Sequence, residues 1–190
     1  MLKLKMNVVV TMLRGVNVGG HNRIKMDALR ALYESLRLRD AATCIQSGNV
    51  VFRSDEPDLV RLAGRIERGI ERTFGFRPAV IVRTASELRG VIANNPFSTR
   101  RNVDPSKLLV FFLASDPGPD ARDTIQRIKA DPEELRIASR ELYIHFPNGA
   151  GRSKLPIVIT RAAKTPMTSR NWNIVTKLLQ MAEALEAAGP

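Results

Sequence analysis

The chain has 190 residues, 44% of them hydrophobic, and its 30 basic against 19 acidic side chains give a formal net charge of +11. A chain of this length and hydrophobicity can bury a core of its own, which excludes an intrinsically disordered protein. The positive charge favours anionic partners: nucleic acid, acidic lipid or phosphorylated small molecules. Much of it lies toward the chain ends, and no acidic residue occurs from Leu142 to Ala182.

The cysteine content and the apolar segments indicate a cellular compartment. Cys44 is the only cysteine, so no intrachain disulfide can form, which fits a reducing compartment. The first 13 residues imitate a signal peptide, but the apolar run stops at Arg14 and no small-residue cleavage site follows. No apolar segment approaches the roughly 20 residues of a membrane helix. We therefore expect a cytoplasmic protein without a membrane segment.

The first half of the chain predicts the order β-α-β-β-α-β. A valine-rich segment over residues 7–13 predicts a strand, and apolar residues at three- and four-residue spacing from Met26 to Leu36 predict a helix. Gly48 can take the positive φ of a tight turn, so residues 43–46 and 49–53 predict a β-hairpin. A helix after Pro57 and a strand over residues 78–83 complete a ferredoxin-like split βαβ arrangement.

The second half repeats this order incompletely. A short helix over residues 86–93 and a connector over 94–106 precede a strand over 107–113 and a helix over 120–129. A hairpin over 135–146 and helices over 153–163 and 171–188 follow. The sequence therefore predicts an α+β protein with two ferredoxin-like subdomains and antiparallel sheets. These are residues 1–93 and residues 107–190, and the second lacks a clear closing strand.

A polar, glycine-rich stretch over residues 12–26, MLRGVNVGGHNRIKM, joins the first strand to the first helix. Such a loop presents free backbone N–H groups at a helix N-terminus, where the helix dipole favours an anion. Gly15, Gly19 and Gly20 allow close backbone approach, and Arg14 and Asn17 supply side-chain donors. Further donors are His21, Asn22, Arg23 and Lys25. The spacing matches neither the dinucleotide nor the P-loop fingerprint, so a structural turn with capping asparagines is the alternative.

Two further loops carry polar residues in the same way. Ser47 and Asn49 lie at the predicted hairpin tip, which we expect at the sheet end where the first strand starts, so this tip and the glycine-rich loop need not share a site. Residues 148–154, NGAGRSK, again lead from a strand through glycines to a helix. Arg152, Ser153 and Lys154 there form a second candidate anion site, although their order is not that of a P-loop.

The segment TSRNWN, residues 168–173, precedes the last helix. Thr168 or Ser169 suits the N-cap position. Trp172 is either a core residue or a platform that stacks a base or sugar. The two histidines and Cys44 fit no familiar metal-site spacing, and no hydrolase motif is present. The sequence thus predicts no metal site and defines no catalytic residue, cofactor or oligomeric state.

The motifs LRGVNVGG, IQSGNVVF, GRSKL and TSRNWN, in this order, resemble a bacterial family defined as domain of unknown function 1697, over nearly the whole chain. This resemblance implies an α+β fold of two ferredoxin-like units and no known activity. Relatives commonly carry two threonines where this chain has Thr168-Ser169, which keeps a hydroxyl. The residues that match the family pattern are Arg14, Gly15, Asn17, Gly19, Gly20, Met26, Ser47, Gly48, Asn49, Arg152, Ser153, Lys154, Arg170, Asn171, Trp172 and Asn173.

The sequence favours a protein that binds, or acts on, a phosphorylated or otherwise anionic small molecule through its glycine-rich loops. The alternative is a nucleic-acid-binding protein that uses basic surfaces. RNA-binding sheets of this kind usually expose aromatic residues, and only Phe52, Tyr143 and Phe146 lie on the predicted hairpin strands. A noncatalytic interaction module is a third reading. The candidate ligand-binding residues are Arg14, Gly15, Asn17, Gly19, Gly20, Ser47, Asn49, Arg152, Ser153, Lys154, Arg170, Asn171, Trp172 and Asn173.

Overall fold

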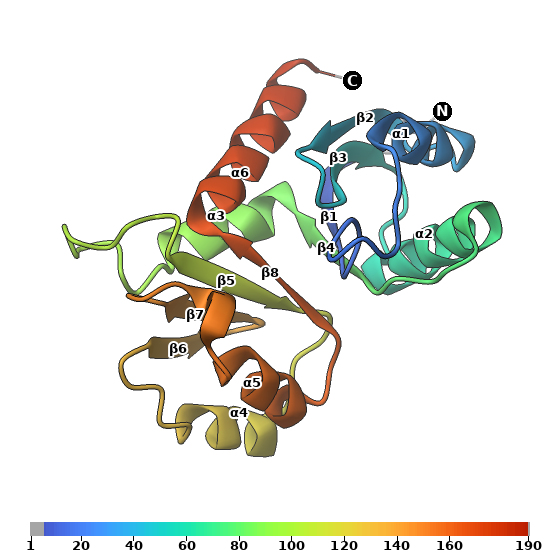
Figure 1. Cartoon of the computed structure of the whole chain (residues 1–190). Coiled ribbons are helices and arrows are strands. Elements are labelled where there is room, and N and C mark those ends of the chain that lie inside the picture. Colours follow the sequence, from blue (N-terminus) through green and yellow to red (C-terminus); the bar gives the residue numbers. More distant parts are fainter. Residues whose placement is uncertain (1–5, 190) are drawn as a thin grey trace. The chain divides into compact units, whose positions relative to one another are not determined.

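A computed structural model describes residues 6–189, which form two compact units, each built on a four-stranded antiparallel sheet (Figure 1). The first unit comprises the chain up to Arg89 together with the chain from Lys177 onward, and the second runs from Gly90 to Thr176. This confirms the predicted α+β class. The first five residues of the segment that imitates a signal peptide lie outside the described residues. None of the helices described here is both long and apolar enough to cross a membrane.

The first unit has the predicted split βαβ order. Its sheet order is β2-β3-β1-β4, and α1 and α2 supply the buried apolar residues that pack with one face of the sheet. Leu29 and Tyr33 of α1 and Ile66 of α2 are fully buried with Val9 and Phe52 of the sheet. The elements are β1 (Asn7–Leu13), α1 (Met26–Ser35), β2 (Arg39–Cys44), β3 (Asn49–Ser54), α2 (Leu59–Phe74) and β4 (Val80–Thr84).

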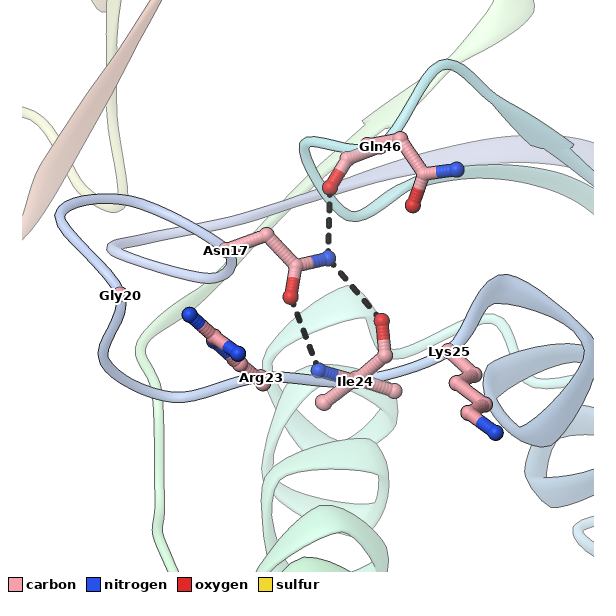
Figure 2. A pocket seen from close by; sticks show the side chains of 6 residues that line it. All are labelled: Asn17, Gly20, Arg23, Ile24, Lys25 and Gln46. Carbon is pink, nitrogen blue, oxygen red and sulfur yellow. Dashed lines mark hydrogen bonds between the residues drawn. The ribbon is translucent and has the colours of Figure 1, made fainter.

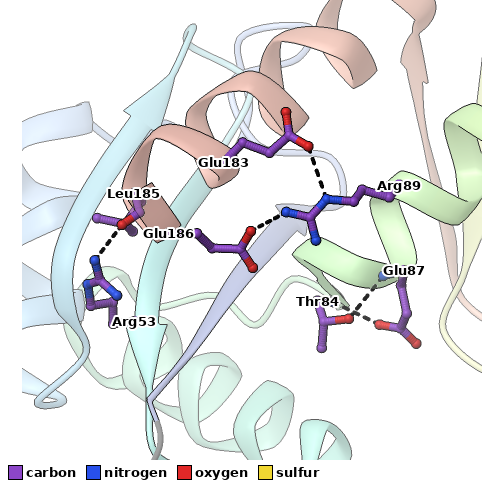
Figure 3. Close-up of polar contacts among 7 residues, drawn as sticks. All are labelled: Arg53, Thr84, Glu87, Arg89, Glu183, Leu185 and Glu186. Carbon is purple, nitrogen blue, oxygen red and sulfur yellow. Dashed lines mark hydrogen bonds and ion pairs between the residues drawn. The ribbon is translucent and has the colours of Figure 1, made fainter. Parts of the chain in front are cut away.

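Local signals fix the helix ends of this unit. The Asp58 carboxylate accepts hydrogen bonds from the backbone N–H groups of Val60 and Arg61, which caps α2. Gly75 ends α2 with a φ of 79°, a left-handed conformation that glycine adopts at little cost. Thr84 and Glu87 form a reciprocal capping box at the start of α3 (Ala85–Ala93), with N···O distances of 2.8 and 3.1 Å (Figure 3).

The second unit repeats the topology of the first, with sheet order β6-β7-β5-β8. Apolar residues of α4 and α5 pack with one face of this sheet, where Ile125 and Ile159 are fully buried with Ile144 and Phe146. A single turn of 3-10 helix (Ala150–Arg152) precedes α5. The elements are β5 (Leu108–Leu113), α4 (Pro119–Gln126), β6 (Glu134–Ala138), β7 (Glu141–His145), α5 (Leu155–Ala163) and β8 (Met167–Asn171).

Strand β8 closes the second sheet, so the expectation that this subdomain lacks a closing strand is wrong. The strand pairs antiparallel with β5 and places Thr168 opposite Phe112 and Arg170 opposite Val110. The strand is hard to recognise in the sequence because most of its residues are polar. These residues can still lie in a sheet because their hydrogen-bonding groups find partners inside the protein. The buried Arg170 guanidinium donates to Thr168 Oγ1 at 2.9 Å and to the Ser169 carbonyl at 2.7 Å.

The last helix, α6 (Trp172–Ala187), is capped by Asn171, since its Oδ1 accepts a hydrogen bond from the Ile174 N–H at 3.0 Å. The prediction of Thr168 or Ser169 as N-cap is therefore wrong: both residues belong to β8. The helix begins in the second unit and ends in the first.

Within the first unit, two arginines hold the end of α6 (Figure 3). The Arg53 guanidinium donates to the carbonyls of Leu185 and Gly189 and also pairs with Asp40 at 3.0 Å. Only 7% of the Arg53 side chain is exposed, and a cation at this position complements the helix dipole. Arg89 of α3 pairs with Glu186 and, at 3.0 Å, with Glu183.

Candidate functional site

Asn17 holds the glycine-rich loop closed. Its Oδ1 accepts a hydrogen bond from the Ile24 N–H at 2.9 Å, and its Nδ2 donates to the Ile24 carbonyl at 3.0 Å and to the Gln46 carbonyl at 2.7 Å (Figure 2). Both amide hydrogens are therefore used within the protein, and Asn17 offers no N–H to a ligand. We call this arrangement the Asn17 clamp.

The Asn17 clamp joins the loop after β1 to the turn between β2 and β3. The prediction that this turn lies at the opposite end of the sheet is wrong. Because β3 runs antiparallel to both β1 and β2, the strands β1 and β2 are parallel and end at the same edge of the sheet. Met12 near the end of β1 accordingly pairs with Asn49 at the start of β3.

The loop backbone bonds mainly to itself. Gly15, Gly19 and Gly20 have φ values of 67°, 60° and 82°, which glycine adopts without steric cost. Asn22 donates through Nδ2 to the Gly15 carbonyl at 3.2 Å, and its own carbonyl accepts from the Asn17 N–H at 3.2 Å. The two asparagines thus act as structural caps of a compact turn.

A pocket of about 470 Å³ lies beside this loop (Figure 2). Its lining includes two exposed cations, Arg23 and Lys25, which make no ion pair or side-chain hydrogen bond within residues 6–189. The Arg23 guanidinium lies over Gly20, with Nη2 3.7 Å from the position of a Cβ at that residue. The side-chain amide of Gln46 is likewise without a partner in the described chain. The lining residues are Asn17, Gly20, Arg23, Ile24, Lys25 and Gln46.

The polar residues of the hairpin tip brace the turn. Asn49 is fully buried, and its Nδ2 donates to the Cys44 carbonyl at 3.1 Å and to Ser47 Oγ at 2.9 Å. Gly48 has a φ of 70°, and a Cβ there would come within 2.9 Å of the Leu13 Cβ. The turn is therefore built tightly against the end of β1.

The second unit has its own pocket, of about 450 Å³, between the end of α4 and the start of α5. Ser153 and Lys154 lie in its wall, whereas Arg152 is exposed and outside it. Ser153 Oγ accepts a hydrogen bond from the Leu155 N–H at 3.1 Å, which helps to cap α5. The lining mixes both signs of charge and apolar residues: Ile128, Lys129, Ala130, Glu133, Ser153, Lys154, Leu155 and Val158.

The remaining predicted site residues line neither pocket. Arg170 is buried, Asn171 caps α6, Trp172 is half-buried and Asn173 is exposed. Arg14, Gly15 and Gly19 are exposed on the glycine-rich loop but outside the first pocket. Conversely, four lining residues are absent from the list of candidate ligand-binding residues, although Arg23 and Lys25 were named as possible donors of the loop: Arg23, Ile24, Lys25 and Gln46. Three of them belong to the polar stretch of residues 12–26, so its cations nearest the helix were the available signal.

A model of a family described as a protein of unknown function, DUF1697, matches residues 6–143. The chain belongs to the DUF1697 family. The matched range contains the first pocket, while residues 148–154 and 167–173 lie beyond it. The conserved bacterial protein SP0830 from Streptococcus pneumoniae shares the fold of this DUF1697 chain: the TM-score is 0.71, the sequences are 21% identical, and 94% of this chain and 99% of that one are covered. No match was found among curated proteins.

Metal-ligand side chains do not gather in this DUF1697 protein as far as the structure describes it. Within residues 6–189 no three His, Cys, Asp or Glu residues form a group that could hold a metal ion. The chemistry available at the first pocket is therefore that of its two cations, its backbone groups and the Gln46 amide.

Proposed function

We propose that the pocket of the first unit binds an anionic small molecule, with Arg23 and Lys25 holding its phosphate or carboxylate group. The observation that supports this is the pair of exposed cations in a pocket whose lining contains no carboxylate. A guanidinium presents a planar fork of N–H donors that matches phosphate and carboxylate oxygens, and an ammonium adds a mobile point charge.

The Asn17 clamp supports this proposal through preorganisation. It connects the loop to Gln46 and Ile24 by three hydrogen bonds before any ligand arrives. A loop that is already fixed loses less conformational entropy when a ligand binds. The volume of about 470 Å³ is in the range of small-molecule sites, which run from about 300 to 1,000 Å³. The ligand can thus be larger than a single phosphate group.

The lining residues favour binding over catalysis. They include no Ser, Thr, Cys, His, Asp or Glu, and such side chains supply most nucleophiles and general acids or bases. A lysine and an arginine can stabilise negative charge on a ligand without any of these groups. We therefore propose a binding protein whose ligand is a phosphorylated or carboxylated metabolite.

The test is isothermal titration calorimetry at low salt with inorganic phosphate, sugar phosphates and nucleotides. We expect Arg23→Gln to weaken the binding of the tightest ligand at least about tenfold, the equivalent of one charged hydrogen bond. Arg14→Gln is the matched control, because it removes the same charge from the same loop outside the pocket. Wild-type affinity in Arg23→Gln and Lys25→Gln would refute the proposal, and loss of binding only in Lys154→Gln would move the site to the second unit.

Burial of the sheet aromatic residues argues against one form of the nucleic-acid alternative, the stacking of bases on the sheet. Phe52 and Phe146 are 0% exposed and Tyr143 is 1% exposed, so these rings cannot stack on bases as the aromatic residues of RNA-binding sheets do. The net charge of +11 still favours contacts to a phosphate backbone, which require a basic surface elsewhere.

A further inference from the structure

Four arginines form a row along α2, which we call the arginine stripe: Arg61, Arg65, Arg68 and Arg72. Their spacing of four, three and four residues places them on one side of a helix with 3.6 residues per turn, over a length of about 16 Å. Arg61, Arg68 and Arg72 are exposed and Arg65 is half-buried. The other side of α2 packs into the core through Leu62, Ile66 and Ile70. The stripe is thus the solvent side of an amphipathic helix.

The acidic residues of α2 do not neutralise the stripe. Glu67 and Glu71 lie on another side of the helix, where both pair with Arg77 at 3.2 and 3.7 Å. Glu67 Oε1 also accepts a hydrogen bond from the Val80 N–H at 3.1 Å. Within the stripe, Arg61 pairs with Glu56 at 3.5 Å, while the other three arginines form no ion pair with any described residue.

Two details describe how the guanidinium groups of the stripe lie on the helix. The Arg65 Nε atom is buried and has no hydrogen-bond acceptor in the described chain, so the terminal Nη groups of this guanidinium are the ones that remain for a partner. The guanidinium of Arg68 lies over Gly64, where a Cβ would be 3.2 Å from its Nη1. The Arg68 side chain therefore occupies the space over Gly64, and a larger side chain at that position would push the guanidinium away.

We propose that the arginine stripe binds the sugar-phosphate backbone of a nucleic-acid duplex. A duplex carries one negative charge per about 1.7 Å of its axis, so a row about 16 Å long meets several phosphates. Arginine is the side chain best matched to phosphate oxygens. The only aromatic residue of α2, Phe74, packs against the core, so the stripe lacks the stacking platform of single-strand binders. The contact depends on the charged sugar-phosphate backbone of the duplex and not on its base sequence.

The test is fluorescence anisotropy with labelled 20-base-pair DNA and RNA duplexes over a salt series. For wild type we expect log affinity to fall with log salt at a slope of about −3.6, because each of four phosphate contacts contributes about −0.9. The triple variant Arg65→Gln/Arg68→Gln/Arg72→Gln should bind with a slope near −0.9. Glutamine is a good helix former, so α2 should persist, and circular dichroism checks this.

The matched control removes the same charge elsewhere: Arg127→Gln/Arg161→Gln/Lys177→Gln. These side chains are exposed and form no ion pair with a described residue, and their loss should leave the slope unchanged. Equal slopes in both triple variants, no wild-type binding at 50 mM salt, or binding of phosphatidylserine vesicles without duplex binding would overturn the proposal. If the stripe variant fails to fold, Arg68→Gln alone should reduce the slope by about one unit. Arg23→Gln should not change duplex binding, so this proposal and the small-molecule pocket fail independently.

Discussion

Gly48 combines two constraints at a single residue. Its φ of 70° is unfavourable for other residues, and a Cβ would lie 2.9 Å from the Leu13 Cβ. Gly48→Ala should therefore lower the free energy of unfolding by about 2–4 kcal/mol, from the left-handed backbone together with overpacking. Gly75→Ala isolates the backbone part, since Gly75 has a φ of 79° but open space around it, and should cost about 1 kcal/mol. Urea unfolding of both variants measures the difference, and equal losses would mean that Leu13 moves aside freely.

The variant Asn17→Asp tests whether the Asn17 clamp depends on the two amide hydrogens of Asn17. Asn17→Asp keeps the shape and the positive φ but replaces Nδ2 by a carboxylate oxygen that faces both the Gln46 and the Ile24 carbonyls. We expect a loss of about 1–3 kcal/mol in the free energy of unfolding and weaker ligand binding at the pocket. Asn22→Asp removes one exposed donor, at 3.2 Å from the Gly15 carbonyl, and should cost less. The clamp is not needed for stability if the two variants unfold at the same urea concentration.

At this scale the sequence identifies polar loop residues but does not separate their roles. Asn17 and Asn49 were candidates for ligand contact, yet both use their amide hydrogens on backbone and hydroxyl groups inside the protein. The bond from Asn17 reaches Gln46, 29 residues away. A partner so distant in sequence is fixed only by the pairing of β1, β2 and β3, which local patterns do not encode.

At the scale of elements, Arg53 and Arg89 hold α6 in the first unit to different degrees. Arg53→Met should lower the free energy of unfolding by about 3 kcal/mol, because the carbonyls of Leu185 and Gly189 and the carboxylate of Asp40 lose a charged donor. Arg89→Met removes only exposed ion pairs and should have a smaller effect. The Arg89 contribution should also fade in molar salt, whereas that of Arg53 should persist. Urea unfolding at low and high salt compares the two, and equal losses would contradict the assigned roles.

The elements that the sequence predicts correctly have simple apolar patterns. The valines of β1 and the three- and four-residue spacing in α1 indicate their structures directly because these elements bury apolar side chains. Strand β8 has no such apolar pattern, since its sequence, MTSRN, is mostly polar. Its Arg170 is buried only because Thr168 and the backbone accept its hydrogen bonds. The arginine stripe was also readable in the sequence as a spacing of four, three and four, but the excess of positive charge toward the chain ends drew attention away from it.

For the molecule as a whole, the two tyrosines report on the two units separately. Tyr33 shares a 2.7 Å hydrogen bond with Thr11, and Tyr143 donates to the Val91 carbonyl at 2.7 Å. Burial raises the pKa of both hydroxyls well above the ordinary value near 10. Since the folded pKa exceeds the unfolded one, the stabilisation is complete below about pH 10 and is lost as the pH rises further.

We therefore expect no tyrosinate absorbance from the folded protein at about pH 10.5, and normal titration near pH 10 in denaturant. Tyr33→Phe and Tyr143→Phe assign the signal to the first or the second unit in an ultraviolet pH titration. A hydroxyl that ionises near pH 10 while circular dichroism still shows the native fold would contradict the burial of that tyrosine.

Helix α6 gives the two units an unusual order of completion during synthesis. Chains leave the ribosome from the N-terminus, so Arg53 and Arg89 emerge long before Leu185 and Glu186, to which they bind. The second unit, which ends at Thr176, is therefore fully translated before the residues from Lys177 onward that complete the first. A chain truncated after Thr176 contains every residue of the second unit but lacks the C-terminal part of the first, although the first was begun earlier.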